Sequence, residues 1–208
     1  MVEVLKGVHS IDFSGLGGLG LECWLLNCPE GLVLVDGGMR ENHLEIIESE
    51  LGSIGKKWSD IDLVLVTHKH GDHTANLGKI KELTEAPVKA HRGDAADIEK
   101  SQNIPVDSLE HGQVIQYCGG IEVIHVPGHS DGNVCYYLHA TKAILAGDTV
   151  FGDSEGNLEA PPERYCKDVD MAKEGIKKLL DYDFDAILLT HGKNSMENAK
   201  EKIKRLCS

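Results

Sequence analysis

Four residues that can bind a metal lie within six positions of one another in the first half of the chain. They are His68, His70, Asp72 and His73, in the pattern His-X-His-X-Asp-His. Imidazole nitrogen and carboxylate oxygen are ligands that suit Zn(II), Fe(II) and Mn(II). No cysteine lies in the cluster, so a closed structural zinc site built on thiolates is not favoured. The spacing therefore predicts a chemically active metal site rather than a histidine-rich surface turn.

The cluster follows an apolar, β-branched run, 61–66, which predicts a buried strand. Ligands on a strand-end loop are held by the scaffold while they stay open to substrate. Three later apolar runs, 121–126, 143–146 and 186–189, repeat this pattern, and each leads into a glycine-containing turn. The possible ligands in these turns are His129, Asp148 and His191. Each alone is more often a cap or a hydrogen-bonded turn residue, but together they supply the extra ligands that a two-metal site needs.

The order of these segments closely resembles that of the metallo-β-lactamase-fold hydrolases over nearly the whole chain. The shared motifs are Thr-His-Lys-His-Gly-Asp-His, Pro-Gly-His-Ser, Gly-Asp-Thr and Thr-His-Gly. The resemblance implies a first metal held by His68, His70 and His129. It implies a second metal held by Asp72, His73 and His191, with the Asp148 carboxylate bridging the two. The expected cofactors are therefore two divalent metal ions, with Zn2+ as the first choice and iron or manganese as alternatives.

The same resemblance assigns supporting and catalytic roles. Asp36, in a Val-Asp-Gly-Gly turn, looks like the family's early aspartate, which supports the metal loop from behind. Asp72 is expected to be catalytic, because it can orient the attacking hydroxide or take its proton. Asp131 departs from the family, in which proline often follows the Pro-Gly-His-Ser turn, and this difference concerns the shape of the loop rather than ligation.

The predicted elements agree with an α/β (α+β) fold. Strands are expected over 2–8, 21–27, 32–36, 61–66, 87–91, 114–117, 121–126, 133–139, 142–146 and 186–189. Helices are expected over 41–51, 75–85, 93–100, 168–180 and 195–206. Strand runs flanked by helices imply sheets packed face to face with helices outside. The family resemblance sharpens this expectation to a four-layer αβ/βα sandwich, the metallo-β-lactamase fold, with the metals at one sheet edge.

Length and charge limit the domain count and the partners. The 208 residues are enough for one compact domain, 1–208, with a substantial core. The net charge of −13 argues against a nucleic-acid partner, whose backbone is bound by clustered Lys and Arg. The chain shows no signal peptide and no apolar run long enough to cross a membrane. We therefore expect a cytoplasmic protein that acts on a small molecule, and the sequence does not predict its oligomeric state.

The six cysteines also bear on the expected cellular location of the protein. They are scattered without a Cys-X-X-Cys pair, and several lie in strand-like runs where cysteine serves as a small hydrophobic residue. We therefore expect no disulfide, which fits a reducing cytosol.

Two loops are candidates for substrate selection. The glycine-rich segment 14–20 joins predicted strands, and the family analogy makes it a mobile flap over the site; a plain flexible hairpin is the alternative. The segment 151–165 directly follows Asp148 and could lay Arg164 or Tyr165 over a bound substrate, although a surface tether is equally consistent. His91 ends a predicted strand at a place where relatives carry a residue near the site mouth.

The function expected from these residues is metal-dependent hydrolysis of a small ester, thioester, lactone or related bond, with a phosphoester or β-lactam also open. The chain ends about 17 residues after His191, without the C-terminal helical region of glyoxalase II-like thioesterases, so a glutathione thioester is not favoured. The alternative on the same fold is an oxidoreductase like the persulfide dioxygenases. That enzyme would use one Fe(II) held by His68, His129 and Asp148. A non-catalytic binding protein is disfavoured, because the ligand set is complete.

Overall fold

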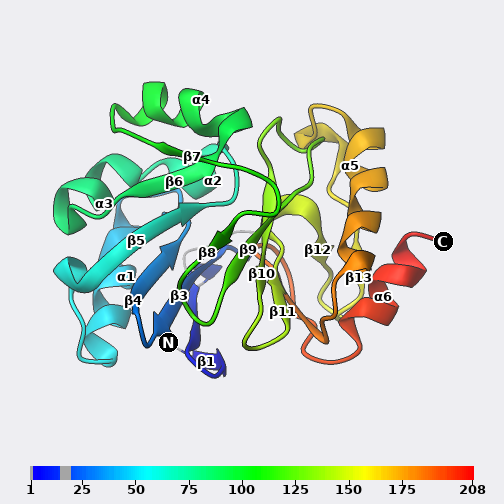
Figure 1. Cartoon of the computed structure of the whole chain (residues 1–208), viewed down its shortest axis with the longest axis horizontal. Coiled ribbons are helices and arrows are strands. Elements are labelled where there is room, and N and C mark those ends of the chain that lie inside the picture. Colours follow the sequence, from blue (N-terminus) through cyan, green and yellow to red (C-terminus); the bar gives the residue numbers. More distant parts are fainter. Residues whose placement is uncertain (1, 15–19) are drawn as a thin grey trace.

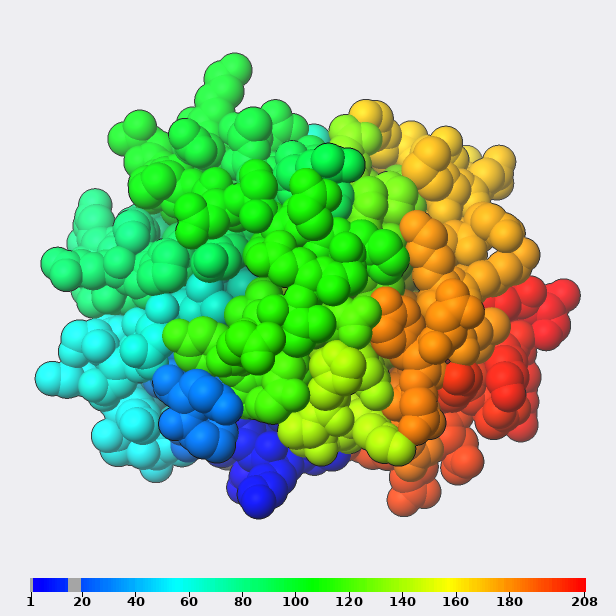
Figure 2. All heavy atoms as spheres, in the orientation of Figure 1, coloured from blue at the N-terminus to red at the C-terminus, as the bar shows by residue number. Residues whose placement is uncertain are grey.

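The computed structural model describes residues 2–14 and 20–208. Two β-sheets pack face to face, and helices cover the outer side of each sheet (Figure 1). This arrangement confirms the expected αβ/βα sandwich. In the space-filling view the earlier part of the chain occupies one side of the molecule and the later part the other (Figure 2). The glycine-rich loop predicted as a flap falls mainly on residues 15–19, which lie outside the described part.

The first sheet has seven strands in chain order, β1-β2-β3-β4-β5-β6-β7. Their bounds are Val2–Leu5, Val8–Asp12, Glu22–Cys28, Gly31–Val35, Ile61–Val66, Val88–His91 and Asp107–Leu109. The pairs from β1 to β4 are antiparallel, and those from β4 to β7 are parallel. β4 and β5 are apolar almost throughout, because parallel strands in such a sandwich are buried on both faces.

The second sheet has five strands in the order β14-β11-β10-β9-β8. In chain order β8 to β11 and β14 span Val114–Ile115, Ile121–His125, Val134–Leu138, Ala143–Leu145 and Ala186–Leu188. A separate hairpin joins β12, Phe151–Gly152, to β13, Leu158–Glu159. β10 is antiparallel to both β9 and β11, and β14 is parallel to β11. β9, β11 and β14 therefore run in the same direction and end at the same edge.

Helices α1, α3 and α4 cover the first sheet, and α5 and α6 cover the second (Figure 1). With the short α2, the α-helices span Asn42–Ser53, Gly71–Thr74, Leu77–Thr84, Arg92–Gln102, Val169–Gly175 and Ala199–Leu206. The 3₁₀ helices η2 to η5 span Trp58–Asp60, Gly147–Thr149, Glu163–Tyr165 and Ile176–Asp181. Within the described ranges, none of the helices is both long and apolar enough to cross a membrane.

Three apolar layers hold the sandwich together. The central layer lies between the sheets and includes the fully buried Trp24 and Tyr136. One outer layer packs the first sheet against α1, α3 and α4, through residues such as Ile47, Ile80 and Ile98. The other packs the second sheet against the C-terminal helices. The Tyr136 hydroxyl donates to the Val66 carbonyl at 2.8 Å, which joins the second sheet to the end of β5.

Most predicted elements are present, and the differences have local causes. The expected strand 2–8 is broken into the hairpin β1–β2, where Gly7 adopts a φ of +73°. The helix expected from Ser195 begins at Ala199, because Ser195 pairs with Ile187 as a short β-bridge instead. The helix expected over 168–180 starts as α5 and tightens into η5. β7 and the β12–β13 hairpin are too short to leave a clear hydrophobic pattern.

The expectation that the cysteines form no disulfide is wrong. Cys28 and Cys118 are joined, with their Cα atoms 4.7 Å apart across 90 residues of sequence. Cys28 ends β3, and Cys118 lies in the turn before β9, so the bond links the two sheets. Two cysteines at this separation carry no sequence signal of pairing, since only the stacking of the sheets brings them together. Cysteine usage therefore no longer supports a reducing cytosol.

Candidate metal centre

All seven predicted ligands lie where four strands end. His68 and His70 lie in the loop after β5, and Asp72 and His73 lie in the short helix α2 that follows it. His129, Asp148 and His191 follow β9, β11 and β14, whose carboxyl ends share one edge of the second sheet. The sandwich brings these loops together because the end of β5 packs against β10, through the Tyr136 hydrogen bond described above.

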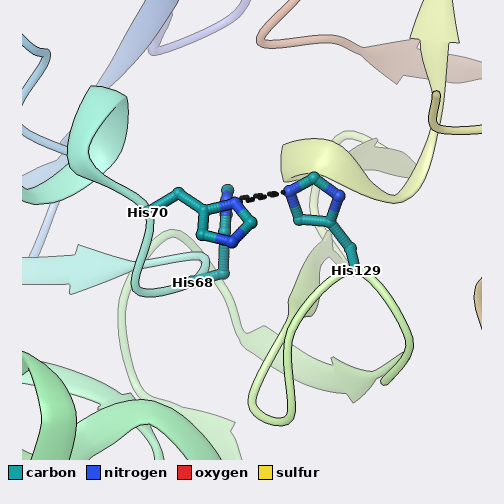
Figure 3. A group of neighbouring side chains, drawn as sticks. All are labelled: His68, His70 and His129. Carbon is teal, nitrogen blue, oxygen red and sulfur yellow. Dashed lines mark hydrogen bonds between the residues drawn. The ribbon is translucent and has the colours of Figure 1, made fainter. Parts of the chain in front are cut away.

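The first cluster is formed by His68, His70 and His129. The Nε2 atom of His129 lies 2.9 Å from Nδ1 of His70 and 3.1 Å from Nε2 of His68. Figure 3 shows the three rings converging from the loop after β5 and the loop after β9. Their ligand nitrogens all lie within 4.8 Å of one another, which is the arrangement of three imidazole ligands around one ion.

The second cluster contains Asp72, His73, Asp148 and His191. The Nε2 atom of His191 lies 3.2 Å from Oδ2 of Asp72, and Nε2 of His73 lies 3.2 Å from Oδ1 of Asp148. His73 and Asp148 are buried, whereas Asp72 is partly exposed. Two imidazoles and two carboxylates form a donor set suited to a divalent transition metal.

Asp148 lies between the two clusters. Its Oδ2 atom is 3.3 Å from Nε2 of His129, in the first cluster. Its Oδ1 atom is 3.2 Å from Nε2 of His73 and 3.6 Å from Nε2 of His191, in the second. One carboxylate therefore presents one oxygen to each cluster, which is the geometry that a bridging ligand requires.

Two buried atoms at the centre support a metal in this place. Within the described part of the chain, neither Nε2 of His73 nor Oδ1 of Asp148 has a hydrogen-bond partner. Burying a polar atom without a partner is costly, so such atoms call for a ligand. These two atoms face one another in the second cluster, and coordination of a divalent cation would satisfy both. The residues present therefore fit a metal.

The pKa values of the histidines shift in different directions in the two clusters. Burial lowers the pKa values of His68 and His70, which keeps their rings neutral and their lone pairs available for a metal. Burial acts to lower the pKa of His73 as well, but the Asp36 and Asp148 carboxylates outweigh it and raise that pKa. Burial acts to raise the pKa of Asp148, but the neighbouring His73 and His129 hold it well below the usual range.

Asp36 supports the second cluster from behind. Its Oδ2 atom lies 2.8 Å from Nδ1 of His73, and its Oδ1 atom accepts from the Thr67 backbone N–H. The Thr67 hydroxyl also donates to Asp36. A carboxylate on the far nitrogen of a ligating histidine fixes the tautomer and the ring orientation. The structure thus places Asp36 directly behind His73, and its supporting role stays a prediction.

Asp94 was not singled out from the sequence, yet it joins the two loops that carry the first cluster. It lies in the first turn of α4 and is almost fully buried. Its carboxylate accepts from the Lys69 backbone N–H at 3.0 Å, from the Gly132 N–H at 2.9 Å and from the Ser130 hydroxyl. An aspartate near a helix start is usually a cap, so the sequence offered no signal for this role.

We expect Asp94→Ala to lower the free energy of unfolding by about 3 kcal/mol, because it leaves the buried Gly132 N–H, the buried Ser130 hydroxyl and the partly buried Lys69 N–H without their acceptor. Denaturant unfolding measures the change. Asp97→Ala is the matched control, since Asp97 lies on the same helix and pairs with Lys69 but is exposed, so its loss should cost at most about 1 kcal/mol. Equal losses in the two variants would contradict the role given to Asp94.

The three predicted substrate contacts lie at different places. His91 is buried, stacks on His125 with ring centroids 3.7 Å apart, and accepts from the Gly93 N–H at the start of α4. Burial, followed by the neighbouring His125, lowers the pKa of His91 to about 4. Arg164 and Tyr165 lie in η4, where the guanidinium stacks over the phenol ring at 4.6 Å. A substrate contact for these three residues stays a prediction.

Phe151 is a further neighbour of the metal centre that the sequence alone did not single out. Its ring stacks on His191, with centroids 5.2 Å apart and an interplanar angle of 11°. It also lies 6.5 Å from the ring of His129, so it contacts one histidine of each cluster. Its place three residues after Asp148 was the available signal.

The comparisons with known proteins agree with this geometry. A family model described as the metallo-beta-lactamase superfamily matches residues 17–191. The chain belongs to this superfamily. It is a metal-dependent hydrolase, in keeping with relatives named as metallo-hydrolases and hydroxyacylglutathione hydrolases.

Two relatives show how far the sequence similarity extends. The probable metallo-hydrolase YflN of Bacillus subtilis (strain 168) is 23% identical over 249 residues, covering 99% of this chain and 93% of its own length. The hydroxyacylglutathione hydrolase of Rhizobium meliloti (strain 1021) is 30% identical over 109 residues, covering 52% of this chain. That match spans only 41% of the hydroxyacylglutathione hydrolase, less than half of its length.

Solved structures show the same fold at low sequence identity. A metallo-beta-lactamase family protein from Thermus thermophilus has a TM-score of 0.77 and 20% identity, covering 98% of this chain and 79% of its own. The metallo-beta-lactamase SMB-1, bound to 2-mercaptoethanesulfonate, has a TM-score of 0.69 and 18% identity, covering 89% and 77%. At these identities the likeness establishes the fold and not a substrate.

Proposed function

We propose that this protein is a dinuclear hydrolase that uses two divalent cations, with zinc as the first choice, to cleave a small ester, thioester or lactone. The observation that carries the proposal is the position of Asp148, which presents one carboxylate oxygen to each histidine cluster. A mononuclear site would not need a buried carboxylate shared in this way. The seven ligands are those named from the sequence.

Two such cations, when bound, would supply a water whose pKa is lowered to near 7 and would polarise the substrate. The side chains of this protein would hold and position these cations. His68, His70 and His129 hold the first cation, while His73 and His191 hold the second together with Asp72. His68, His73, His129 and Asp148 are buried, and the low polarity around them strengthens electrostatic interactions at the site.

Asp72 is the residue proposed to handle the proton. Its side chain has 29% relative exposure, against 5% for that of Asp148, so it is the more accessible carboxylate at the centre. Burial acts to raise its pKa, but the hydrogen bond from His191 and the nearby His73 together outweigh this effect and lower the pKa from its usual value. An ionised carboxylate at this place can orient the nucleophile and accept its proton.

The substrate is proposed to be a small molecule rather than a nucleic acid, because the net charge of −13 would repel a phosphate backbone. A thioester is among the candidates, since hydroxyacylglutathione hydrolases are among the relatives. The cytoplasmic location expected from the sequence stays a prediction, and the Cys28–Cys118 disulfide removes one of its supports.

A second candidate function is also supported by the geometry of the site. His68, His129 and Asp148 converge, with His129 at 3.1 Å from His68 and 3.3 Å from Asp148. Two histidines and one carboxylate also form the ligand set of mononuclear Fe(II) oxygenases. The same centre could therefore serve a dioxygenase that acts on a sulfur compound, and the bound metal discriminates between the two.

Elemental analysis of protein purified without oxygen and without a chelating column is the first test. We expect about two zinc or manganese ions per chain. Removing them with a chelator should abolish the hydrolysis of activated esters or lactones, and returning zinc should restore it. One iron per chain, with no hydrolysis after zinc loading, would instead favour the dioxygenase.

A further inference from the structure

Cys166 lies against the back of the first metal cluster. Its Sγ atom is 3.9 Å from Nδ1 of His129, within hydrogen-bond reach for sulfur. The residue directly follows η4 and is only partly exposed. It is one of four free cysteines and takes no part in the disulfide. Neither the seven ligands nor the proposed hydrolysis uses this thiol.

The two nitrogens of His129 have different surroundings. Nε2 faces His68 and His70 and is therefore the ligand atom. A neutral imidazole that gives one nitrogen to a metal carries its hydrogen on the other nitrogen. Nδ1 of His129 then donates to the Cys166 sulfur, and the thiol in turn donates to the Pro162 carbonyl at 3.6 Å. The three groups form a short chain that leads from the metal cluster into the segment after β13.

Three other ligand histidines have an oxygen next to the nitrogen that faces away from the clusters. His73 has Asp36 at 2.8 Å, His191 has the Gly20 carbonyl at 2.7 Å, and His68 has the Thr67 hydroxyl at 3.2 Å. Ligating histidines are generally oriented by such a partner, and losing it weakens metal binding. At His129 a sulfur occupies the corresponding place.

We propose that Cys166 is a positioning residue, which orients His129 by accepting the Nδ1 hydrogen bond and thereby sets the metal affinity of the first cluster. This inference rests on the proposed function, because it requires a cation at His68, His70 and His129. The contact of Cys166 also connects the segment 151–166 to the metal centre. Phe151 touches His191 at one end of this segment, and Cys166 touches His129 at the other.

The test compares zinc affinity by competition with a chromophoric chelator. Each variant is measured in a His191→Ala background, in which the second cluster has lost a ligand and the titration reports on the first. Cys166→Ala, which removes the acceptor, should weaken zinc binding about ten-fold, the lower end of the effect for losing such a partner. Cys166→Ser keeps an acceptor and should recover part of the loss. Cys207→Ala is the control, because this free cysteine packs near α6, away from the ligands.

A second readout separates orientation from a general loss of structure. In long-range ¹H–¹⁵N spectra of the zinc-loaded protein, Cys166→Ala should shift the Nδ1 signal of His129 and leave that of His73 in place. Zinc affinity within two-fold of the parent, together with an unmoved His129 signal, would overturn the proposal. If the wild-type protein binds two zinc ions and hydrolyses esters while this result holds, only the role of Cys166 fails. A wild-type protein that binds no divalent metal would overturn the proposed function as well.

Discussion

Asp148→Asn is expected to lower kcat/KM for an activated ester or lactone on the order of a thousand-fold, equivalent to about 4 kcal/mol of transition-state stabilisation. The substitution keeps the size of the side chain but removes the charge that faces both clusters. One oxygen of Asp148 lies beside His129 and the other beside His73 and His191, so its charge faces both clusters. The loss should therefore affect both cations.

The metal content should fall together with the activity. We expect Asp148→Asn to retain fewer than two zinc ions per chain after dialysis against a weak chelator. His68→Ala should also abolish turnover, because it removes a buried imidazole that we propose as a ligand in the first cluster. Circular dichroism checks that both variants keep the fold.

Asp183→Asn is the matched control for Asp148→Asn. It is the same Asp-to-Asn substitution at an exposed site. Asp183 pairs with Lys142 there, away from the predicted ligands. Its replacement should leave kcat/KM and zinc content at the wild-type level. Wild-type turnover by Asp148→Asn, or an equal loss in both variants, would remove the proposed centre.

Breaking the Cys28–Cys118 disulfide is expected to lower the free energy of unfolding by about 4–5 kcal/mol, because the bond closes a loop of 90 residues and restricts the unfolded chain. Denaturant unfolding of the double variant Cys28→Ala/Cys118→Ala measures this change against the oxidised wild-type protein. The bond lies at the edge where β4 and β9 begin, opposite to the metal edge. We therefore expect the metal content and kcat/KM of the folded variant to stay unchanged.

A reducing agent provides the complementary measurement. It should shift the unfolding midpoint of the wild-type protein toward that of the double variant, and leave the variant itself unaffected. Cys207→Ala controls for the loss of a thiol elsewhere. Identical unfolding curves for the wild-type protein with and without reductant would show that the bond contributes no stability.

The sequence was sufficient to predict the features that depend on residues close together in the chain. His68 to His73 are adjacent in the chain, so their common role was visible in their spacing. The later ligands could be added because each follows an apolar strand, and the strand ends of a sandwich meet at one edge. The strand and helix runs were also enough to predict sheets packed face to face with helices outside, and the family resemblance sharpened this to the four-layer sandwich.

The tertiary structure alone decided the contacts between segments that are far apart in the chain. These contacts join residues between 25 and 90 positions apart. They are the Cys28–Cys118 bond, the hydrogen bonds of Asp94 to two loops, and the contact of Cys166 with His129. Such pairs have no periodicity, because each contact depends on how sheets and loops stack and not on neighbouring residues. In the sequence, Asp94 resembles an ordinary helix cap and Cys166 is one of six scattered cysteines. Only the packing of the β5 and β9 loops against α4 and η4 gives them a place behind the metal ligands.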